Sequence, residues 1–249
     1  MVSLAPAEGV SIDGVSIDPA KSTVGLLLSG GLDSSILLGK LAREGHSIQP
    51  FYMKFGLFWE SAELHAVQKY LSAVASPGIR PLLVFELPLA DIYGQHWSVT
   101  GQNVPDFDSP DQAVFLPGRN ALLAIKAAFW CQMHHVRDLA LATLSSNPFP
   151  DATARFFRDL ESVLQTALSA DLRLLRPFEH FSKRQVMQAG RDLPLELTFS
   201  CIAPVGGLHC GACNKCIERM NAFCLIEQPD PTVYAAGPGR PLAMSGHAS

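Results

Sequence analysis

The feature that most constrains this chain is an apolar run that stops at two glycines. Residues 24–28 carry no polar side chain, and Ser29-Gly30-Gly31-Leu32-Asp33-Ser34 follows them directly. Such a run, ended by glycines, is typical of a strand buried on both faces of a parallel sheet. Apolar residues then recur at helical spacing between Ile36 and Leu41, and Asp33 or Ser34 is a candidate N-cap. The segment therefore predicts a strand, a glycine-rich loop and a helix, in that order.

The same alternation of strand and helix signals continues along most of the chain. It predicts an α/β fold built on a doubly wound, mostly parallel sheet. Residues 88–114 interrupt the alternation with a polar stretch rich in Pro, Asp and Gln, which is typical of a lid or binding loop. We expect further strands at residues 48–53, 81–87, 138–142 and 172–175, and helices at residues 60–75, 120–134, 151–169 and 182–190.

The composition disfavours several classes of protein. The 249 residues are 48% hydrophobic and 17% charged, which is ample for a buried core. The net charge of −4 supplies no overall basic field, so a nucleic-acid partner is not expected. The sequence has neither a run of about 18 apolar residues nor a secretion signal, so we expect no membrane association and a cytoplasmic location. The six cysteines are then expected to be reduced.

The glycine loop has the composition of an anion-binding site. Glycines let the backbone approach an anion closely, and a helix N-terminus offers unpaired N–H groups. Ser29 and Ser34 add hydroxyl donors, whereas Asp33 suits a phosphate site only if it holds Mg²⁺. The loop lacks the Gly-Lys-Ser/Thr ending of a Walker A motif and the third glycine of a dinucleotide-binding fingerprint. The alternative interpretation is an ordinary glycine-rich turn between a strand and a helix.

Four cysteines near the C-terminus have the spacing of a metal site. Cys201, Cys210, Cys213 and Cys216 include two C-x2-C steps, which favours a tetrahedral zinc site without an open position. We therefore expect a structural zinc ion that holds the C-terminal segment against the main domain. An iron–sulfur cluster or free thiols are the alternatives. The remaining cysteines, Cys131 and Cys224, are expected to be packing residues.

The two motifs, in this order, resemble the 7-cyano-7-deazaguanine synthase family of queuosine biosynthesis, whose members are PP-loop ATP pyrophosphatases. The likeness runs from about residue 24 to residue 223. Ser182-Lys183 is similar to the family's Thr-Lys helix start. Three further stretches look like the family's Pro-x-Arg-Asn box, its Tyr-Pro-Asp segment and its cysteine-rich end; they are residues 115–120, 147–151 and 200–219.

The resemblance implies a PP-loop fold, similar to that of the adenine nucleotide alpha hydrolases, and a carbon–nitrogen ligase. Family members adenylate 7-carboxy-7-deazaguanine with ATP, add ammonia to form the amide, and activate the amide again to form the nitrile. The resemblance also implies Mg²⁺, one structural Zn²⁺ per chain and a homodimer. The implied partners are thus a small carboxylate and ammonia.

The resemblance also assigns residues to roles. Asp33, Arg119 and Lys183 are the implied catalytic residues, and Arg119 is the implied clamp on phosphate or carboxylate. A structural ion pair for Arg119 and a solvated surface position for Lys183 are the alternatives. Asp151 is a substrate contact or, slightly favoured, the N-cap of the helix that follows it. The implied ATP-binding residues are Leu28, Ser29, Gly30, Gly31, Leu32, Asp33, Ser34, Ser35, Arg119 and Asn120, and the implied substrate-binding residues are Arg119, Pro150 and Asp151.

The chain departs from the family in the segments expected to surround the carboxylate substrate. Residues 55–59 read Phe-Gly-Leu-Phe-Trp, where the family has a Tyr-Gly-Gln-Arg-His-like stretch. Residues 145–148 form a shorter segment than in the family, and Ala152 replaces a common cysteine. A pocket that loses polar groups accepts a different ligand. We therefore keep three alternatives: a changed acceptor, such as a protein amine in a defence system; a different end-point; and a tRNA-modifying PP-loop enzyme.

The sequence further predicts how the chain is divided. We expect a flexible leader over residues 1–22, which contains a five-residue duplication, and an ATP-binding α/β domain over residues 23–194. A zinc-binding segment over residues 195–226 is expected to pack on that domain. Residues 227–249, rich in Pro and Gly, are expected to form a disordered tail.

Overall fold

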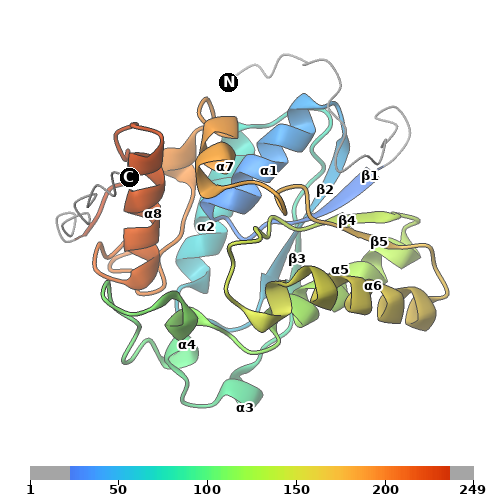
Figure 1. Cartoon of the computed structure of the whole chain (residues 1–249), viewed down its shortest axis with the longest axis horizontal. Coiled ribbons are helices and arrows are strands. Elements are labelled where there is room, and N and C mark those ends of the chain that lie inside the picture. Colours follow the sequence, from blue (N-terminus) through green and yellow to red (C-terminus); the bar gives the residue numbers. More distant parts are fainter. Residues whose placement is uncertain (1–22, 236–249) are drawn as a thin grey trace, which may run out of the picture.

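The computed structural model describes residues 23–235 and contains one five-stranded, wholly parallel sheet (Figure 1). The strand order is β3-β2-β1-β4-β5, so the sequence reverses direction across the sheet at β1. This confirms the predicted doubly wound α/β fold. The predicted leader, residues 1–22, lies outside the described residues. The strands are β1 (Thr23–Leu27), β2 (Ser47–Lys54), β3 (Leu83–Glu86), β4 (Asp138–Ala140) and β5 (Arg173–Leu175).

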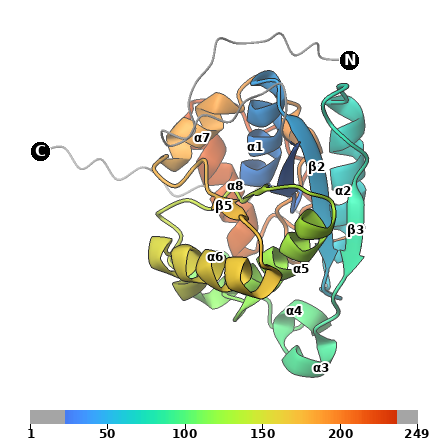
Figure 2. The same cartoon turned by 90° about the vertical axis from the view of Figure 1, so that its right-hand side faces the viewer.

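Helices cover both faces of this sheet, as Figure 2 shows for α5 and α6 on one side and α1 and α7 on the other. The expected helices at residues 60–75, 120–134, 151–169 and 182–190 are present with slightly different bounds. Within the described residues, no helix is both long and apolar enough to cross a membrane. The α-helices are α1 (Leu32–Arg43), α2 (Glu60–Ala73), α3 (Ala90–Tyr93), α4 (Trp97–Thr100), α5 (Arg119–Met133), α6 (Ala154–Leu168), α7 (Lys183–Ala189) and α8 (Asn214–Leu225).

The side chains of β1 alternate between the two cores. Val24 and Leu26 are fully buried against α1, α2 and α7, whereas Leu27 faces α5 and α6. Gly25 lies on the second side, where an added Cβ would come within 2.8 Å of Phe51 and 3.0 Å of Cys131. The missing side chain therefore lets α5 approach the central strand. Burial on both faces explains why the run at residues 24–28 has no polar side chain.

Several local predictions need correction. Residues 88–114 are not wholly irregular, because they include α3, α4 and the 3-10 turn Asp111–Val114. The N-cap of α1 is Gly31, not Asp33 or Ser34, which lie inside the first turn. The predicted capping box of α7, between Ser182 and Gln185, is present.

The expected disordered tail does not begin at residue 227. Residues 227–235 pack against the cysteine-rich segment: Thr232 Oγ1 accepts a hydrogen bond from Arg219 Nε at 2.5 Å, and the Ala235 amide donates to the His209 carbonyl at 2.8 Å. The Asp230 side chain also accepts from Tyr234 Oη at 2.5 Å. Side-chain hydrogen bonds hold this stretch although its composition resembles that of a linker. Residues 236–249 lie outside the described part of the chain.

The packing of α7 on α1 should be sensitive to one methyl group. A Cβ added at Gly190, which ends α7, would collide with Ile36 Cγ1 and lie 2.7 Å from Ile36 Cδ1. We expect Gly190→Ala to lower the free energy of unfolding by about 1–3 kcal/mol through overpacking. In an Ile36→Ala background the same change should cost less than about 0.5 kcal/mol, because the clash is removed. Urea denaturation of the four proteins measures this coupling; an equal cost in both backgrounds would contradict the assignment.

Candidate active site

The glycine loop lies at the carboxyl end of β1, where the order of the strands reverses. Gly30 has a φ of +79°, and an added Cβ would lie 2.7 Å from Val67 Cγ2, so both backbone and packing require glycine there. The Ser34 hydroxyl accepts a hydrogen bond from the Ser29 amide at 3.2 Å. The Phe199 amide donates to the Gly30 carbonyl at 2.7 Å. The loop is thus fixed in place by α2 and by the segment that precedes the cysteines.

A hollow of about 300 Å³ opens above this loop. Ligands of open parallel sheets bind at such a reversal point, outside the carboxyl ends of the strands. Most of the sequence-predicted site residues line the hollow, but Gly30, Ser35 and Pro150 do not. Ser35 is fully buried, and Gly30 acts through its backbone. The predicted residues that line the hollow are Leu28, Ser29, Gly31, Leu32, Asp33, Ser34, Arg119, Asn120, Asp151 and Lys183.

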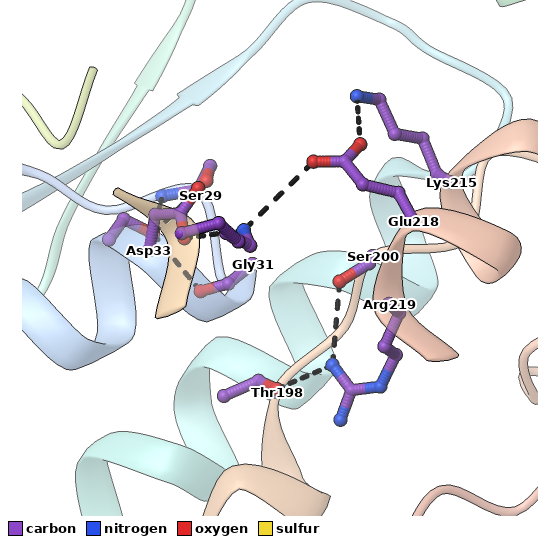
Figure 3. Close-up of polar contacts among 10 residues, drawn as sticks. Ser29, Gly31, Asp33, Thr198, Ser200, Lys215, Glu218 and Arg219 are labelled. Atoms are coloured by element: carbon purple, nitrogen blue, oxygen red, sulfur yellow. Dashed lines mark hydrogen bonds and ion pairs between the residues drawn. The ribbon is translucent and has the colours of Figure 1, made fainter. Parts of the chain in front are cut away.

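Four charged side chains from three helices meet on one side of the loop. Lys183 Nζ, at the start of α7, lies 2.7 Å from Asp33 Oδ1 and 3.9 Å from Glu218 Oε1. Lys215 Nζ lies 2.5 Å from Glu218 Oε2, and Figure 3 shows α8 presenting Lys215 and Glu218 toward the loop. Burial alone would lower the pKa of Lys183, but Asp33 and Glu218 outweigh it and raise that pKa above its usual value. Lys183 is therefore not a solvated surface lysine.

Arg119, the first residue of α5, points into the same hollow without a carboxylate partner. No acidic oxygen of residues 23–235 lies within 4.0 Å of its guanidinium, so the alternative of a structural ion pair fails. Its Nε is buried and donates a hydrogen bond to no side chain or backbone group of residues 23–235. The guanidinium carbon lies 6.0 Å from the centre of the Phe55 ring. A buried donor without an acceptor is suited to an anionic ligand.

Asp151 does not cap the helix that follows it. Thr153 is the N-cap of α6, and its hydroxyl accepts from the Phe156 amide at 3.2 Å. Asp151 Oδ2 instead accepts from the Asn120 backbone amide at 3.1 Å, and Asn120 Nδ2 donates to the Asp151 carbonyl at 3.0 Å. The carboxylate satisfies an unpaired N–H group in the first turn of α5 and so orients the helix that carries Arg119. The predicted cap was wrong because Thr153, which directly precedes α6, occupies its N-cap position.

The sequence did not indicate Glu63 as a site residue. Glu63 is buried beside the loop, lines the hollow and accepts from Tyr52 Oη at 2.7 Å. Burial raises the pKa of this carboxyl to about 7, although Arg119 and the Tyr52 hydroxyl act in the opposite direction. Its spacing to Val67 and Tyr70 on the buried side of α2 was the signal that could have found it.

Aromatic rings line a second region of the hollow. Trp59 and Trp97 stack with ring centroids 5.8 Å apart, and Phe115 and Phe149 lie 5.1 Å apart. All four residues line the hollow. Trp59 belongs to the apolar stretch at residues 55–59, and Trp97 comes from the polar stretch at residues 88–114. The wall of the hollow thus has a charged part at the glycine loop, its charged end, and an apolar, flat part formed by these four rings, its aromatic end.

The four cysteine sulfurs form one cluster. All four lie within 4.8 Å of one another, and both the Cys201–Cys213 and Cys210–Cys216 sulfur pairs are 3.9 Å apart. A tetrahedral zinc site with Zn–S bonds of about 2.3 Å has sulfurs roughly 3.8 Å apart. Backbone amides donate to two of these sulfurs at 3.2–3.4 Å, among them the Cys210 amide to Cys201 Sγ. The donor set and its spacing fit a zinc ion with four thiolate ligands.

Arg219 connects this cluster to the hollow. It is 1% exposed, and its guanidinium donates to Thr198 Oγ1 at 2.8 Å (Figure 3). It also donates to the Leu195 carbonyl at 2.7 Å. No carboxylate lies within 4.0 Å of it among the residues that the structure describes. The side chain therefore joins α8 to the segment 195–200, which reaches the glycine loop through Phe199.

Curated proteins match most of the chain. The chain is 30% identical to "7-cyano-7-deazaguanine synthase 1" of Desulfitobacterium hafniense (strain Y51), over 84% of this chain and 94% of that protein. It is 28% identical to "7-cyano-7-deazaguanine synthase" of Pseudomonas paraeruginosa (strain DSM 24068 / PA7), over 84% and 96%. The structure "Crystal structure of a 4-thiouridine synthetase - RNA complex with bound ATP" matches 83% of this chain and 50% of that chain, with 17% identity and a TM-score of 0.47.

The family described as "Queuosine biosynthesis protein QueC" matches residues 23–227. This range includes the glycine loop, Arg119, Lys183 and all four clustered cysteines. The predicted resemblance and the prediction of an enzyme are thereby confirmed. The identities near 30% agree with the departures noted at residues 55–59 and 145–148. The chain belongs to the QueC family, as a divergent member.

Proposed function

We propose that this protein is an ATP-dependent carbon–nitrogen ligase that adenylates 7-carboxy-7-deazaguanine and converts it with ammonia to the amide and then the nitrile. The observation that carries the proposal is the charged end of the hollow, where the glycine loop, Lys183 and Arg119 converge. The curated relatives are named 7-cyano-7-deazaguanine synthases, and they are matched over most of their length.

Each residue at the charged end has a role suited to transfer of AMP. The loop amides and the N-terminus of α1 bind phosphate oxygens. Arg119 and Lys183 stabilise the negative charge that develops on the α-phosphate and the departing pyrophosphate, and positioning supplies much of the rate enhancement. Asp33 is suited to hold a Mg²⁺ ion, which neutralises part of the phosphate charge. Without ATP, the Lys183 ammonium group pairs with Asp33. When ATP binds, this group contacts the phosphates instead.

We further propose one structural zinc ion per chain, held by the four clustered cysteines. The sulfur spacing supports this assignment, as does the amide donation to the thiolates. The ion would have no open coordination position, so its role is to fix the segment 195–216 and α8 against the α/β domain.

The aromatic end of the hollow favours a second candidate function. Trp59, Phe115 and Phe149 line the hollow, and the apolar Leu57 and Phe58 stand in the stretch where the resemblance implies polar residues. Removing polar partners from a pocket changes which acid or end-point it favours. The second candidate is a PP-loop ligase that activates the same acid but transfers it to an amine other than ammonia.

Replacing Asp33 should abolish the chemistry without unfolding the protein. We expect Asp33→Asn to lower the rate of AMP formation roughly 100-fold or more, as loss of a single electrostatic contact to a transition state does. The assay contains ATP, Mg²⁺, ammonia and 7-carboxy-7-deazaguanine, with AMP measured by chromatography and the product by mass. Asp192→Asn, an exposed carboxylate that lines no part of the hollow, is the matched control and should keep full activity.

The product mass separates the two candidate functions. A nitrile supports the first candidate, and a primary amide supports the same ligase with an earlier end-point. AMP release without an ammonia-derived product supports the second candidate. Wild-type protein that releases no AMP with this acid would disprove the proposed substrate. An Asp33→Asn variant with wild-type pyrophosphate release would disprove the role of the loop.

Loss of one clustered cysteine should release the metal. We expect wild-type protein to contain one zinc ion per chain by elemental analysis, and Cys213→Ser to contain much less. The melting temperature should fall by more than about 10 °C, because zinc binding contributes directly to folding. Cys224→Ser is the matched control, since Cys224 is exposed and lies outside the cluster. Equal zinc content in the two variants would rule out the site.

A further inference from the structure

Four carboxylates of the described residues line the hollow, and one of them has no cationic partner. Asp33 and Glu218 each pair with a lysine, and Asp151 accepts from a backbone amide in the first turn of α5. Glu63 is the fourth, and no Lys, Arg or His nitrogen of residues 23–235 lies within 4.0 Å of its oxygens. A buried carboxylate without such a partner is costly unless hydrogen-bond donors stabilise it.

One oxygen of Glu63 is free to contact a ligand. Oε2 accepts from Tyr52 Oη at 2.7 Å. No hydrogen bond from residues 23–235 reaches Oε1, and Oε1 is not among their enclosed polar atoms without a partner, so it has accessible surface. Glu63 is only 9% exposed and lines the hollow, so a ligand there can donate to Oε1. Burial raises the pKa of this carboxyl to about 7, because the donors present do not fully stabilise its charge.

Arg119 is the complementary group in the same hollow. Its guanidinium has no carboxylate partner, and its buried Nε has no acceptor among the described residues. Its positive charge favours the ionised form of Glu63, although the two side chains are more than 4.0 Å apart. A ligand that pairs with both needs an anionic group for Arg119 and N–H donors for Glu63.

The surroundings of Glu63 favour a flat heterocycle as the source of these donors. Trp59 lies one helical turn before Glu63, whose amide donates to the Trp59 carbonyl at 3.1 Å, and its ring stacks on Trp97. A flat ring packed on this aromatic end therefore lies beside Glu63. An ionised carboxylate accepts two parallel N–H groups at once, which a 2-aminopyrimidinone ring presents along one edge. Adenine instead places a ring acceptor next to its amino group and suits a carboxylate less well.

We propose that Glu63 is a specificity-determining residue that binds the 2-aminopyrimidinone N–H edge of the acid through Oε1. The inference rests on the proposed function, which supplies a deazaguanine acid as the ligand. The carboxylate of the same molecule is then directed toward Arg119 at the charged end. Glu63 forms no covalent bond. It selects the acid because a ligand without these N–H groups leaves a buried carboxylate unpaired.

Titration calorimetry of the full chain tests this assignment with two acids. The ligands are 7-carboxy-7-deazaguanine and 7-carboxy-7-deazahypoxanthine, which lacks the 2-amino group. The buffer is at pH 8, where a carboxyl with a pKa of about 7 is mostly ionised, and contains Mg²⁺ and α,β-methylene-ATP. We expect the wild type to bind the amino compound about tenfold or more tightly, the gain typical of one charged hydrogen bond. Glu63→Gln should bind the two acids with affinities within about threefold of each other.

The matched control is Glu196→Gln, which removes the same charge from an exposed glutamate that lines no part of the hollow. It should keep the wild-type preference between the two acids. Unchanged affinity for α,β-methylene-ATP verifies that Glu63→Gln is folded. If that variant does not fold, Glu63→Asp replaces it: the charge stays, the carboxylate is withdrawn by one methylene, and the preference should again be lost.

A preference that survives in the folded Glu63 variants would overturn the proposal, as would a wild type without preference. Weaker binding of the ATP analogue with an unchanged preference would also overturn it, because Glu63 would then bind the nucleotide. The assay measures binding and is therefore separate from turnover. Wild-type protein that binds the amino compound preferentially but releases no AMP keeps this assignment and loses the proposed function. AMP release with no effect of the Glu63 variants on the preference does the reverse.

Discussion

The hydrogen bond from the Phe199 amide to the Gly30 carbonyl, 2.7 Å long, joins the two parts of the chain on which the site depends. Gly30 belongs to the loop that follows the central strand, and Phe199 lies two residues before the first clustered cysteine. An added Cβ at Gly30 would clash with Val67, so the loop can pack this closely against α2 only if residue 30 is glycine. Once this contact is made, the cysteine cluster and α8 must lie beside the loop. The charged side chains of α8 then face the glycine loop and the first turn of α1.

The electrostatics of α8 suit a zinc site with four thiolates. Such a site has a formal charge of about −2. Arg219 is almost completely buried, and its described hydrogen-bond partners are all uncharged. A buried guanidinium is unfavourable unless a nearby negative charge compensates it. Asp230 has the largest such effect on Arg219, and Cys216, one helical turn before Arg219, adds to it. The negative charge of the cysteine cluster thus helps to stabilise the buried Arg219, in addition to the role of its sulfurs in holding a metal.

The sequence predicted what depends on local pattern. Apolar runs predicted the strands, the glycines predicted the loop, and the spacing of Cys201 to Cys216 predicted the metal cluster. It did not predict what depends on partners distant in the chain. Asp151 serves α5 through Asn120, 31 residues away in sequence, instead of the helix that follows it. The site roles of Glu63 and Glu218 likewise depend on which helices meet at the loop, and α8 itself was not expected. Spacing along one helix can show that a residue is buried, but not what it faces.

The two ends of the hollow are built from different kinds of structure, and this difference explains where the chain diverges. The charged end rests on β1 and on the first turns of α1, α5 and α7, and these elements are packed into the main cores. A change there disturbs the sheet as well as the site. The aromatic end comes mainly from connecting segments, which contribute Trp59, Phe115 and Phe149, and from the four-residue helix α4, which contributes Trp97. Loops accept substitution more readily than packed elements do. A family with this architecture can therefore keep its glycine loop while the aromatic walls of the hollow change, which is the pattern of departures in this sequence.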